Sequence, residues 1–590
     1  MTIHELQQRY ASGDTPSQVI GELLGKIRAW NDPALFIHLP EPAELLALAA
    51  AMEAMPRDLP LWGIPFVVKD NIDVAGWPTT AGCPDYAYTP LHDAEVVRLL
   101  RAAGAIPLGK TNLDQFATGL VGTRSPYGVP RNAHAPEFLP GGSSSGSASA
   151  VAAGLCAFGL GTDTAGSGRV PAAFQELIGW KPTRGLLSNR GLVPACRSLD
   201  CISVLATTVA DAAAVAAVVA EFDILDAFSR QVAQTGTLGA SFRFGVPRAL
   251  DFAGDPDTPA LFAAAVDQLI ACGGTPVEID LAPFTEAAKL LYEGPWVAER
   301  WAAVGDFVAQ HPDAVFPVTR QILEASRGWE ATATFRAHYQ LREFTRLADA
   351  VWQQIDVLLL PTTPRLFTVA ENLAEPFATN AVLGRYTNFM NLLDLAAVAL
   401  PAGRARAGRA PWGITLAAPS GWDQALLRLA SRFAGETPAS ARIPSAATRI
   451  PVAVCGAHLH GLALHWQLAD RGATLRSTTT TAPVYRLYAM PPSGSIPPRP
   501  ALIHVADGGA AIEVEVWDLD PAAFGDFVAK IPAPLGIGKV TLASGEQVPG
   551  FIAEPRAAAD ALEITSYGGW RAWLAAASGA EPNPTPPLKP

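Results

Sequence analysis

The chain has 590 residues, more than one hydrophobic core normally supports, so its length predicts two or three domains. Its 43 Lys and Arg residues stand against 55 Asp and Glu, a formal net charge of -12 without any basic run, which argues against nucleic acid and anionic membrane surfaces as partners. Apolar residues make up 49% of the chain, but no uncharged window forms a spanning helix, so we expect a soluble protein.

The six cysteines are scattered and form no CxxC pair, which fits reduced structural thiols better than disulfides or a zinc site. The first residues lack the basic and then apolar layout of a secretory signal. We therefore expect a cytoplasmic protein that acts on a small molecule and uses no metal and no cofactor.

Two helices are predicted at the start of the chain, because residues 3–30 show helical spacing that breaks at 12–14 and resumes after Thr15 and Pro16, a cap and a first-turn proline. A third helix is predicted over 41–55. Residues 61–71 then change to β-branched and aromatic residues, which predicts a buried strand with Lys69 at its end. A lysine in that place is ordinarily a snorkelling side chain, not a catalyst.

Helical and strand patterns alternate from residue 94 onward. This alternation predicts an α/β domain with a central mixed sheet covered by helices. The predicted elements are helices over 94–103, 113–120, 209–221 and 258–271, a mostly helical segment over 285–355, and strands over 105–109, 242–246, 275–279 and 356–364.

A stretch rich in Pro, Ser and Ala, without periodicity, separates two predicted domains. We expect a first domain over 1–432, a linker over 433–449 and a smaller α+β domain over 450–575. Strand signals in the second domain lie at 452–455, 501–505 and 511–516. The proline-rich residues 576–590 are predicted to be a disordered tail.

Two glycine- and serine-rich loops, at 141–146 and 161–169, flank a segment over 148–160 that carries no charge. A flexible linker is the ordinary interpretation of such composition, but a linker should be followed by a composition break, and a buried segment follows here. Glycine loops around a short buried element can converge on one small ligand.

The second loop predicts an oxyanion hole, because the amides of Thr164, Ala165 and Gly166 can form a concave nest beside Ser167. Ser167 would then be a nucleophile that needs a base. The ten histidines lie in ordinary helical or loop contexts or in the second domain. The remaining candidate is Lys69, if burial lowers its pKa, with Ser143 of the first loop relaying the proton.

At these residues the chain resembles the amidase signature family, whose catalytic triad is Ser, cis-Ser and Lys. The resemblance covers residues 20–430. It implies that Ser167 is the nucleophile, that Ser143 is the bridging serine with a cis peptide bond, and that Lys69 is the general base. It also implies that Asp163 and Arg169 brace the loop.

Two positions depart from the commoner form of the motif: Ser145 and Ala165 stand where glycine is usual. Ala165 keeps its amide, so the oxyanion hole should survive. A rival interpretation is that residues 142–146 fit the G-x-S-x-G nucleophile elbow. That elbow should follow a strand, whereas 135–140 is a proline-bounded loop, which disfavours it.

The GTDTAGSGR form of the loop, together with residues 456–461 of the second domain, resembles the allophanate hydrolase branch of this family. The resemblance implies hydrolysis of allophanate to ammonia and carbon dioxide through N-carboxycarbamate, in urea or s-triazine nitrogen use, and a γ-glutamyl cyclotransferase-like second domain. The alternative is an amidase for another small amide, such as malonamide or biuret, whose second domain serves only in assembly.

A small anionic substrate needs local positive charge in a chain of net charge -12. The resemblance implies that Arg300 grips the carboxylate while Tyr292, eight residues earlier, fixes its orientation. Without the resemblance, these residues would be taken as an exposed helix arginine and a core tyrosine.

The resemblance implicates the second domain in the loss of carbon dioxide. His458 is the candidate there, with Glu513 or Glu515 as weaker ones, and a histidine hydrogen-bonded within a small domain is the ordinary alternative. We expect a homodimer.

Overall fold

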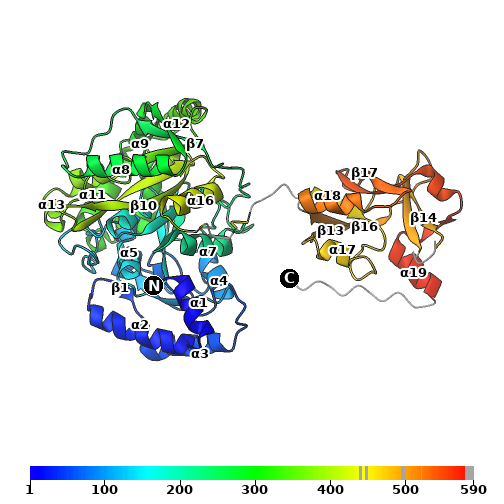
Figure 1. Ribbon diagram of the computed structural model, residues 1–590, viewed down its shortest axis with the longest axis horizontal. Coiled ribbons are helices and arrows are strands. Elements are labelled where there is room, and N and C mark those ends of the chain that lie inside the picture. Colours follow the sequence, from blue (N-terminus) through cyan, green and yellow to red (C-terminus); the bar gives the residue numbers. More distant parts are fainter. Residues whose placement is uncertain (438–441, 445–449, 493–497, 520, 579–590) are drawn as a thin grey trace. The chain divides into compact units, whose positions relative to one another are not determined.

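The computed structural model describes residues 1–437, 442–444, 450–492, 498–519 and 521–578 (Figure 1). Contacts within the chain divide it into two units, Met1–Ser445 and Ala446–Pro590. Most of the predicted linker lies outside the described residues, and so does the predicted tail apart from 576–578, which end a helix.

The first unit is built on one eleven-stranded mixed sheet with the order β1-β3-β2-β4-β6-β5-β10-β11-β9-β7-β8. The trios β3-β2-β4 and β9-β7-β8 are parallel, and the strands between them pair antiparallel. The strands are β1 (Phe36–His38), β2 (Pro65–Lys69), β3 (Ile106–Thr111), β4 (Phe158–Asp163), β5 (Ile178–Lys181), β6 (Cys201–Ala206), β7 (Phe242–Pro247), β8 (Gly274–Ile279), β9 (Val357–Pro361), β10 (Ala396–Ala405) and β11 (Ala410–Ala418).

Helices cover this sheet, which confirms the predicted fold class; α1 to α3, in blue, gather at one end of the unit in Figure 1. The helices are α1 (Ile3–Ala11), α2 (Pro16–Trp30), α3 (Pro42–Glu53), α4 (Glu95–Ala102), α5 (Ser145–Ala152), α6 (Arg169–Phe174), α7 (Val209–Val219), α8 (Thr258–Ala271), α9 (Ala282–Tyr292), α10 (Val297–Gln310), α11 (Pro317–Ala325), α12 (Ala331–Trp352), α13 (Val369–Ala374), α14 (Pro376–Leu383), α15 (Phe389–Leu392) and α16 (Asp423–Phe433).

The start of α2 follows its predicted cap. The Thr15 side chain accepts a hydrogen bond from the Gln18 amide, the Gln18 side chain accepts one from the Thr15 amide, and Pro16 fills the first turn. These local signals explain why α1 and α2 are two helices and not one.

The helix predicted over 113–120 is wrong. Only a short 3-10 turn, Gln115–Ala117, forms there, and Phe116 has φ +51°. The Asp114 carboxylate accepts hydrogen bonds from the amides of Val121, Gly122 and Arg124, at 2.9 to 3.1 Å. An aspartate that binds backbone amides in this way stabilises a loop in place of a helix.

The parallel pair β2 and β4 places two functional segments together. Phe66 pairs with Phe158 and Val68 with Leu160, so the two strands end at the same edge of the sheet. The rings of Phe66 and Phe158 stack 5.1 Å apart and are fully buried. Lys69 therefore lies beside the end of β4 and the loop that follows it.

The second unit has a five-stranded sheet, β13-β16-β12-β18-β17, and a three-stranded sheet, β15-β14-β19, with its own hydrophobic core. This agrees with the predicted small α+β domain. Its elements are β12 (Ile450–Val454), α17 (Trp466–Ala469), β13 (Thr474–Thr480), β14 (Tyr485–Met490), β15 (Arg499–His504), β16 (Glu513–Leu519), α18 (Pro521–Ala529), β17 (Leu535–Thr541), β18 (Gln547–Ala553), β19 (Leu562–Glu563) and α19 (Trp570–Ser578).

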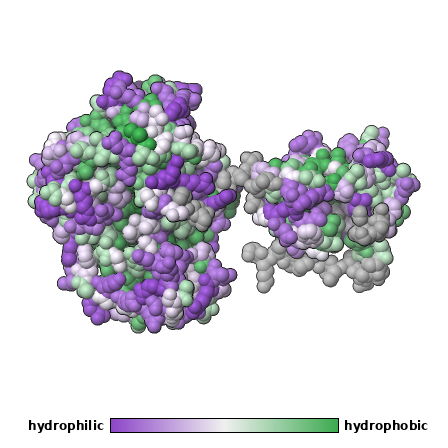
Figure 2. All heavy atoms as spheres, viewed as in Figure 1, coloured by the Kyte–Doolittle hydropathy of each residue, from purple (hydrophilic) through white to green (hydrophobic). Residues whose placement is uncertain are grey.

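Hydrophilic side chains are spread over the visible face of each unit in Figure 2. In the part of the chain that the structure describes, no helix has both the length and the apolar character needed to cross a membrane.

Candidate active site

Lys69, the last residue of β2, is fully buried. Its ammonium donates hydrogen bonds to Ser143 Oγ at 2.7 Å and to Thr162 Oγ1 at 2.6 Å. Burial lowers the pKa of Lys69 to about 7, against the opposing effect of nearby carboxylates, of which Asp114 is the strongest. A buried lysine held by hydroxyl groups can exist as a neutral amine near neutral pH, which a general base requires.

Ser143 lies in the first glycine-rich loop, directly after a cis peptide bond to Gly142. This loop is tightly enclosed: a side chain on Gly142 would place its Cβ 2.2 Å from a carboxylate oxygen of Asp114. The Asp114 amide also donates to the Ser143 carbonyl oxygen at 3.1 Å. Glycine at 142 is therefore required by packing, and the loop holds the Ser143 hydroxyl against Lys69.

Ser167 lies in the loop between β4 and α6 and is 2% exposed. Its hydroxyl donates to the Gly119 carbonyl oxygen at 3.4 Å. Within the described residues no hydrogen bond joins Ser143 to Ser167. The structure thus brings Lys69 and Ser143 into direct contact and places Ser167 on the adjoining loop, with its hydroxyl turned to a main-chain oxygen.

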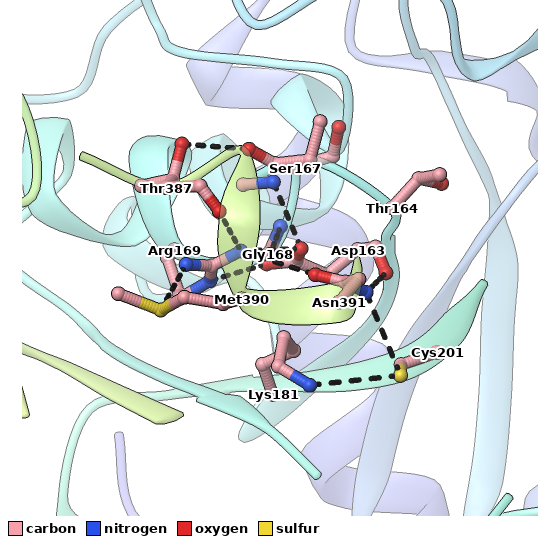
Figure 3. A network of polar contacts seen from close by, with 12 residues as sticks. Asp163, Thr164, Ser167, Gly168, Arg169, Lys181, Cys201, Thr387, Met390 and Asn391 are labelled. Atoms are coloured by element: carbon pink, nitrogen blue, oxygen red, sulfur yellow. Dashed lines mark hydrogen bonds and ion pairs between the residues drawn. The ribbon is translucent and has the colours of Figure 1, made fainter. Parts of the chain in front are cut away.

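Asp163 and Arg169 brace the Ser167 loop from behind (Figure 3). The two side chains form a fully buried, two-pronged ion pair at 2.8 Å, and the carboxylate also accepts from the amides of Gly166 and Gly168 at 2.8 and 3.1 Å. Burial alone would raise the pKa of Asp163, but the Arg169 guanidinium holds it below its usual value. The loop is fixed from inside by one carboxylate.

A second brace comes from more than 200 residues later in the chain. Thr387 Oγ1 donates to the Ala165 carbonyl at 2.6 Å, and Asn391 Nδ2 donates to the Asp163 carbonyl at 2.8 Å. Gly166 has φ +134°, and a Cβ there would lie 2.4 Å from Thr387 Oγ1. No local sequence signal singled out Thr387 or Asn391.

The predicted oxyanion hole requires one correction. Because the Gly166 amide is committed to the Asp163 carboxylate, it is not a free donor. The amides of Thr164, Ala165 and Ser167 have no hydrogen-bond partner among the residues described here. These three amides are the ones available to a developing negative charge.

Asp200 is a further buried group that the sequence did not indicate. Its carboxylate accepts from the Thr164 hydroxyl and from the amides of Ala195 and Cys196. Burial raises the pKa of Asp200 to about 6. The hydroxyl of Thr164 therefore binds Asp200 and does not occupy the amides of the Ser167 loop.

Arg300 and Tyr292 lie together as predicted, at the start of α10 and the end of α9. Arg300 is 2% exposed, not an exposed helix arginine. Its guanidinium donates to Tyr292 Oη at 3.3 Å and to Thr118 Oγ1 at 3.0 Å. Tyr292 lines a cavity of about 820 Å³, together with Arg124, Val297, Phe377, Asn380 and Asn388.

The sequence profile described as Amidase matches residues 18–427. The chain belongs to the amidase family. A second profile, described as the allophanate hydrolase C-terminal domain, matches residues 450–575 of this amidase.

Known proteins of similar sequence and structure span different parts of the amidase chain. It is 43% identical over 547 residues to the urea amidolyase of Saccharomyces cerevisiae, covering 88% of this chain and 30% of that protein, and it is 41% identical to that of Lachancea kluyveri, covering 95% and 32%. The chain thus spans about a third of the length of these relatives. The solved Kluyveromyces lactis allophanate hydrolase is 39% identical, with a TM-score of 0.72 over 98% of this chain and 99% of that chain.

His458, in the second unit of the amidase, lines a separate cavity of about 250 Å³ with Gln467, Arg499, Lys530 and Phe551. Its Nε2 is hydrogen-bonded to Gln467 Oε1 at 3.0 Å, and its ring stacks on Phe551. Burial lowers the pKa of His458.

The two glutamates predicted as weaker candidates lie elsewhere in the second unit. Glu515 is buried and accepts from the His460 amide, the Trp517 indole and Arg571, and Glu513 also pairs with Arg571. Both oxygens of Glu515 therefore have donors within the second unit, whereas Glu513 has, among the described residues, a single ion pair at 3.5 Å.

Proposed function

We propose that this amidase hydrolyses allophanate, the anion of urea-1-carboxylic acid, with Lys69, Ser143 and Ser167 as its catalytic residues. The observation that carries the proposal is the Lys69 amine: fully buried, 2.7 Å from Ser143 Oγ, with a pKa of about 7. The names of the relatives, urea amidolyase and allophanate hydrolase, favour this substrate.

In the first step Ser167 Oγ attacks the carboxamide carbon. Its proton passes to Ser143 Oγ as the proton of Ser143 passes to neutral Lys69. The carbonyl oxygen becomes negative and is bound by the amides of Thr164, Ala165 and Ser167. The proton then returns through Ser143 to the departing nitrogen, ammonia leaves, and Ser167 carries an N-carboxycarbamoyl ester.

In the second step a water molecule replaces ammonia. Neutral Lys69 removes its proton through Ser143, hydroxide attacks the ester carbon, and Ser167 leaves with the returned proton. The product is N-carboxycarbamate, a dianion with two carboxylates, which takes up two protons and loses two molecules of carbon dioxide, by way of carbamate, to give a second ammonia. A base with a pKa near the working pH is suited to both directions of this proton transfer.

We propose that Arg300 and Tyr292 bind the carboxylate of allophanate. A buried guanidinium can donate two parallel hydrogen bonds to a carboxylate, and the Tyr292 hydroxyl 3.3 Å away can fix its orientation. Arg300→Ala should raise the KM for allophanate roughly 100-fold, about what loss of a charge-assisted pair removes. An unchanged KM would rule out this role.

An ammonia-release assay over allophanate, biuret, malonamide and a long-chain amide tests the substrate. The proposal expects allophanate to have the highest kcat/KM. The assay also tests the alternative that another amide is preferred. A higher kcat/KM for malonamide or biuret would overturn the allophanate assignment.

We propose that His458 assists the loss of carbon dioxide from N-carboxycarbamate. Its burial against Phe551 and its place in a cavity that also holds Arg499 and Lys530 support binding of an anion there. In full-length His458→Asn, release of the first ammonia should keep its rate while the second lags. Equal rates for both would make His458 structural and leave the second unit to assembly.

The remaining assignments rest on simpler observations. All six cysteines are free thiols, which supports the proposal that the protein works in the cytoplasm. The two units support domain limits of 1–432 and 450–575. We propose a homodimer, and light scattering on the full chain tests it: a mass of one chain would reject it.

A further inference from the structure

Arg124 lines the same cavity of about 820 Å³ as Tyr292. It is 2% exposed. Its guanidinium donates to the carbonyl oxygens of Thr118 at 2.9 Å and Pro376 at 2.8 Å, and its buried Nε has no hydrogen-bond partner among the described residues. The mechanism above makes no use of this side chain.

Thr118 joins Arg124 to Arg300. The Thr118 carbonyl oxygen accepts from Arg124, and the Thr118 hydroxyl accepts from Arg300 at 3.0 Å. In the part of the chain that the structure describes, neither guanidinium forms an ion pair with a carboxylate. The next residue, Gly119, accepts a hydrogen bond from the Ser167 hydroxyl at 3.4 Å, so the segment that contacts both guanidinium groups also contacts the nucleophile.

Two buried cations side by side are costly unless an anion joins them. Burial and the nearby Arg300 lower the pKa of Arg124, against the opposing effect of Asp114 and Tyr292. The Asp114 carboxylate is itself occupied by three loop amides. The positive charge is therefore available to a negative ligand in the cavity.

A purely structural role would need only the two hydrogen bonds to main-chain carbonyls. A neutral amide side chain can make one of these bonds, and neither requires a charge. Arg169 is also buried, but its charge is matched by Asp163. Arg124 differs from it in its unpartnered Nε and in having no ion pair among the described residues.

We propose that Arg124 is a specificity-determining residue, a second buried cation that selects small amides carrying a carboxylate. The proposal rests on the proposed function and deepens it, because Arg300 contacts the carboxylate while Arg124 acts on it through the shared Thr118 and through charge. The same pair should bind dicarboxylates, the class to which N-carboxycarbamate belongs, more tightly than neutral diamides.

The test compares Arg124→Gln with wild type on allophanate and on neutral biuret, as substrate or competitive inhibitor. Removing this buried charge should raise the KM for allophanate about 10- to 100-fold and leave kcat, and the KM or inhibition constant for biuret, within about threefold. Arg124→Lys, which keeps the charge, should retain the wild-type preference within about threefold. Arg131→Gln, which also loses a bond to a main-chain carbonyl, at Asn31, is the matched control and should behave as wild type.

An equal loss on allophanate and biuret would make Arg124 structural and overturn the proposal. If Arg124→Gln does not fold, Arg124→Lys is tested in its place. Loss of the preference for the anionic substrate in Arg124→Lys would also overturn the proposal. Malonate, an unreactive dicarboxylate, separates the two proposals. If wild type does not hydrolyse allophanate, the proposed function fails. Calorimetry should still show that Arg124→Gln binds malonate more weakly than wild type does, while both bind malonamide equally. Equal malonate affinities of wild type and Arg124→Gln would overturn the Arg124 proposal.

Discussion

Two lysines on neighbouring strands, Lys69 at the end of β2 and Lys110 in β3, are both fully buried. Lys110 Nζ forms an ion pair with Asp70 at 3.1 Å and also donates to Thr79 Oγ1 and the Pro78 carbonyl. Among the described residues, the hydrogen bonds of Lys69 Nζ go to the hydroxyls of Ser143 and Thr162. Burial is therefore the same for the two ammonium groups, and the partner differs.

The partner decides what each lysine can do. A carboxylate at contact distance favours the charged ammonium, so Lys110 is suited to a structural role, although burial lowers its pKa as well. Hydroxyl partners favour neither form strongly and can themselves carry a proton. Lys69 can therefore titrate near neutral pH. Its neutral amine suits catalysis, but the cost of burying the ammonium lowers the free energy of unfolding.

The largest expected effect is the loss of turnover on removing the Lys69 amine. Lys69→Ala, Ser143→Ala and Ser167→Ala should each lower kcat by about 10⁴-fold or more, because the three residues act as one unit. Steady-state ammonia release measures this, with circular dichroism to check the fold. A Lys69→Ala protein with full activity would remove Lys69 from the mechanism.

The next effect concerns stability and belongs to the other lysine. Lys110→Ala leaves Asp70 buried without its cation, which should cost about 3–5 kcal/mol in the free energy of unfolding. Urea denaturation measures the free energy of unfolding, and the folded Lys110→Ala protein should still hydrolyse the amide substrate. A loss below about 1 kcal/mol would mean that Asp70 is not held by Lys110.

The pH dependence of activity tests the free amine. Because Lys69 must be neutral to accept a proton and its pKa is about 7, kcat/KM should rise about tenfold per pH unit below 7 and level off above it. The measurement is a pH profile between 5 and 9 for allophanate. A profile that is flat from pH 5 to 7 would contradict a titrating Lys69.

The smallest effect is a gain of stability in an inactive variant. The pKa of Lys69 falls from 10.5 to about 7 on folding, so the unfolded chain binds more protons between these values and the fold is penalised at neutral pH. Lys69→Met removes the penalty and should raise Tm by a few degrees at pH 7. The gain should shrink as pH rises toward 10.5; a gain that grows with pH would reverse the sign of the argument.

The sequence predicted the outer parts of the large sheet better than its centre. β2, β3, β7, β8 and β9 carry β-branched and aromatic residues and were predicted, whereas β10 and β11 fill the middle of the sheet and were not. Their residues are rich in Ala and Gly, which have weak strand propensity. Their strand conformation is imposed by pairing with β5 and β9, which no local pattern can show.

The same division holds in the site. Ser143 and Ser167 lie in loops of unusual local composition and Lys69 ends a buried strand, so the three could be proposed as site residues from the sequence and its family resemblance. Thr387 acts through its contact with a loop 222 residues away, and it lies in the turn between α14 and α15. Whether the Gly166 amide is free depends on the orientation of the Asp163 carboxylate, which the spacing of residues in the sequence cannot predict.

The late brace of the Ser167 loop has a consequence for the order of synthesis. The loop is complete by residue 169, yet Asn391 and strands β10 and β11, which close the middle of the sheet, are made more than 200 residues later. We expect a nascent chain to carry its nucleophile unsupported until almost the whole unit has left the ribosome. Activity would then begin abruptly, late in translation, once these segments have been made.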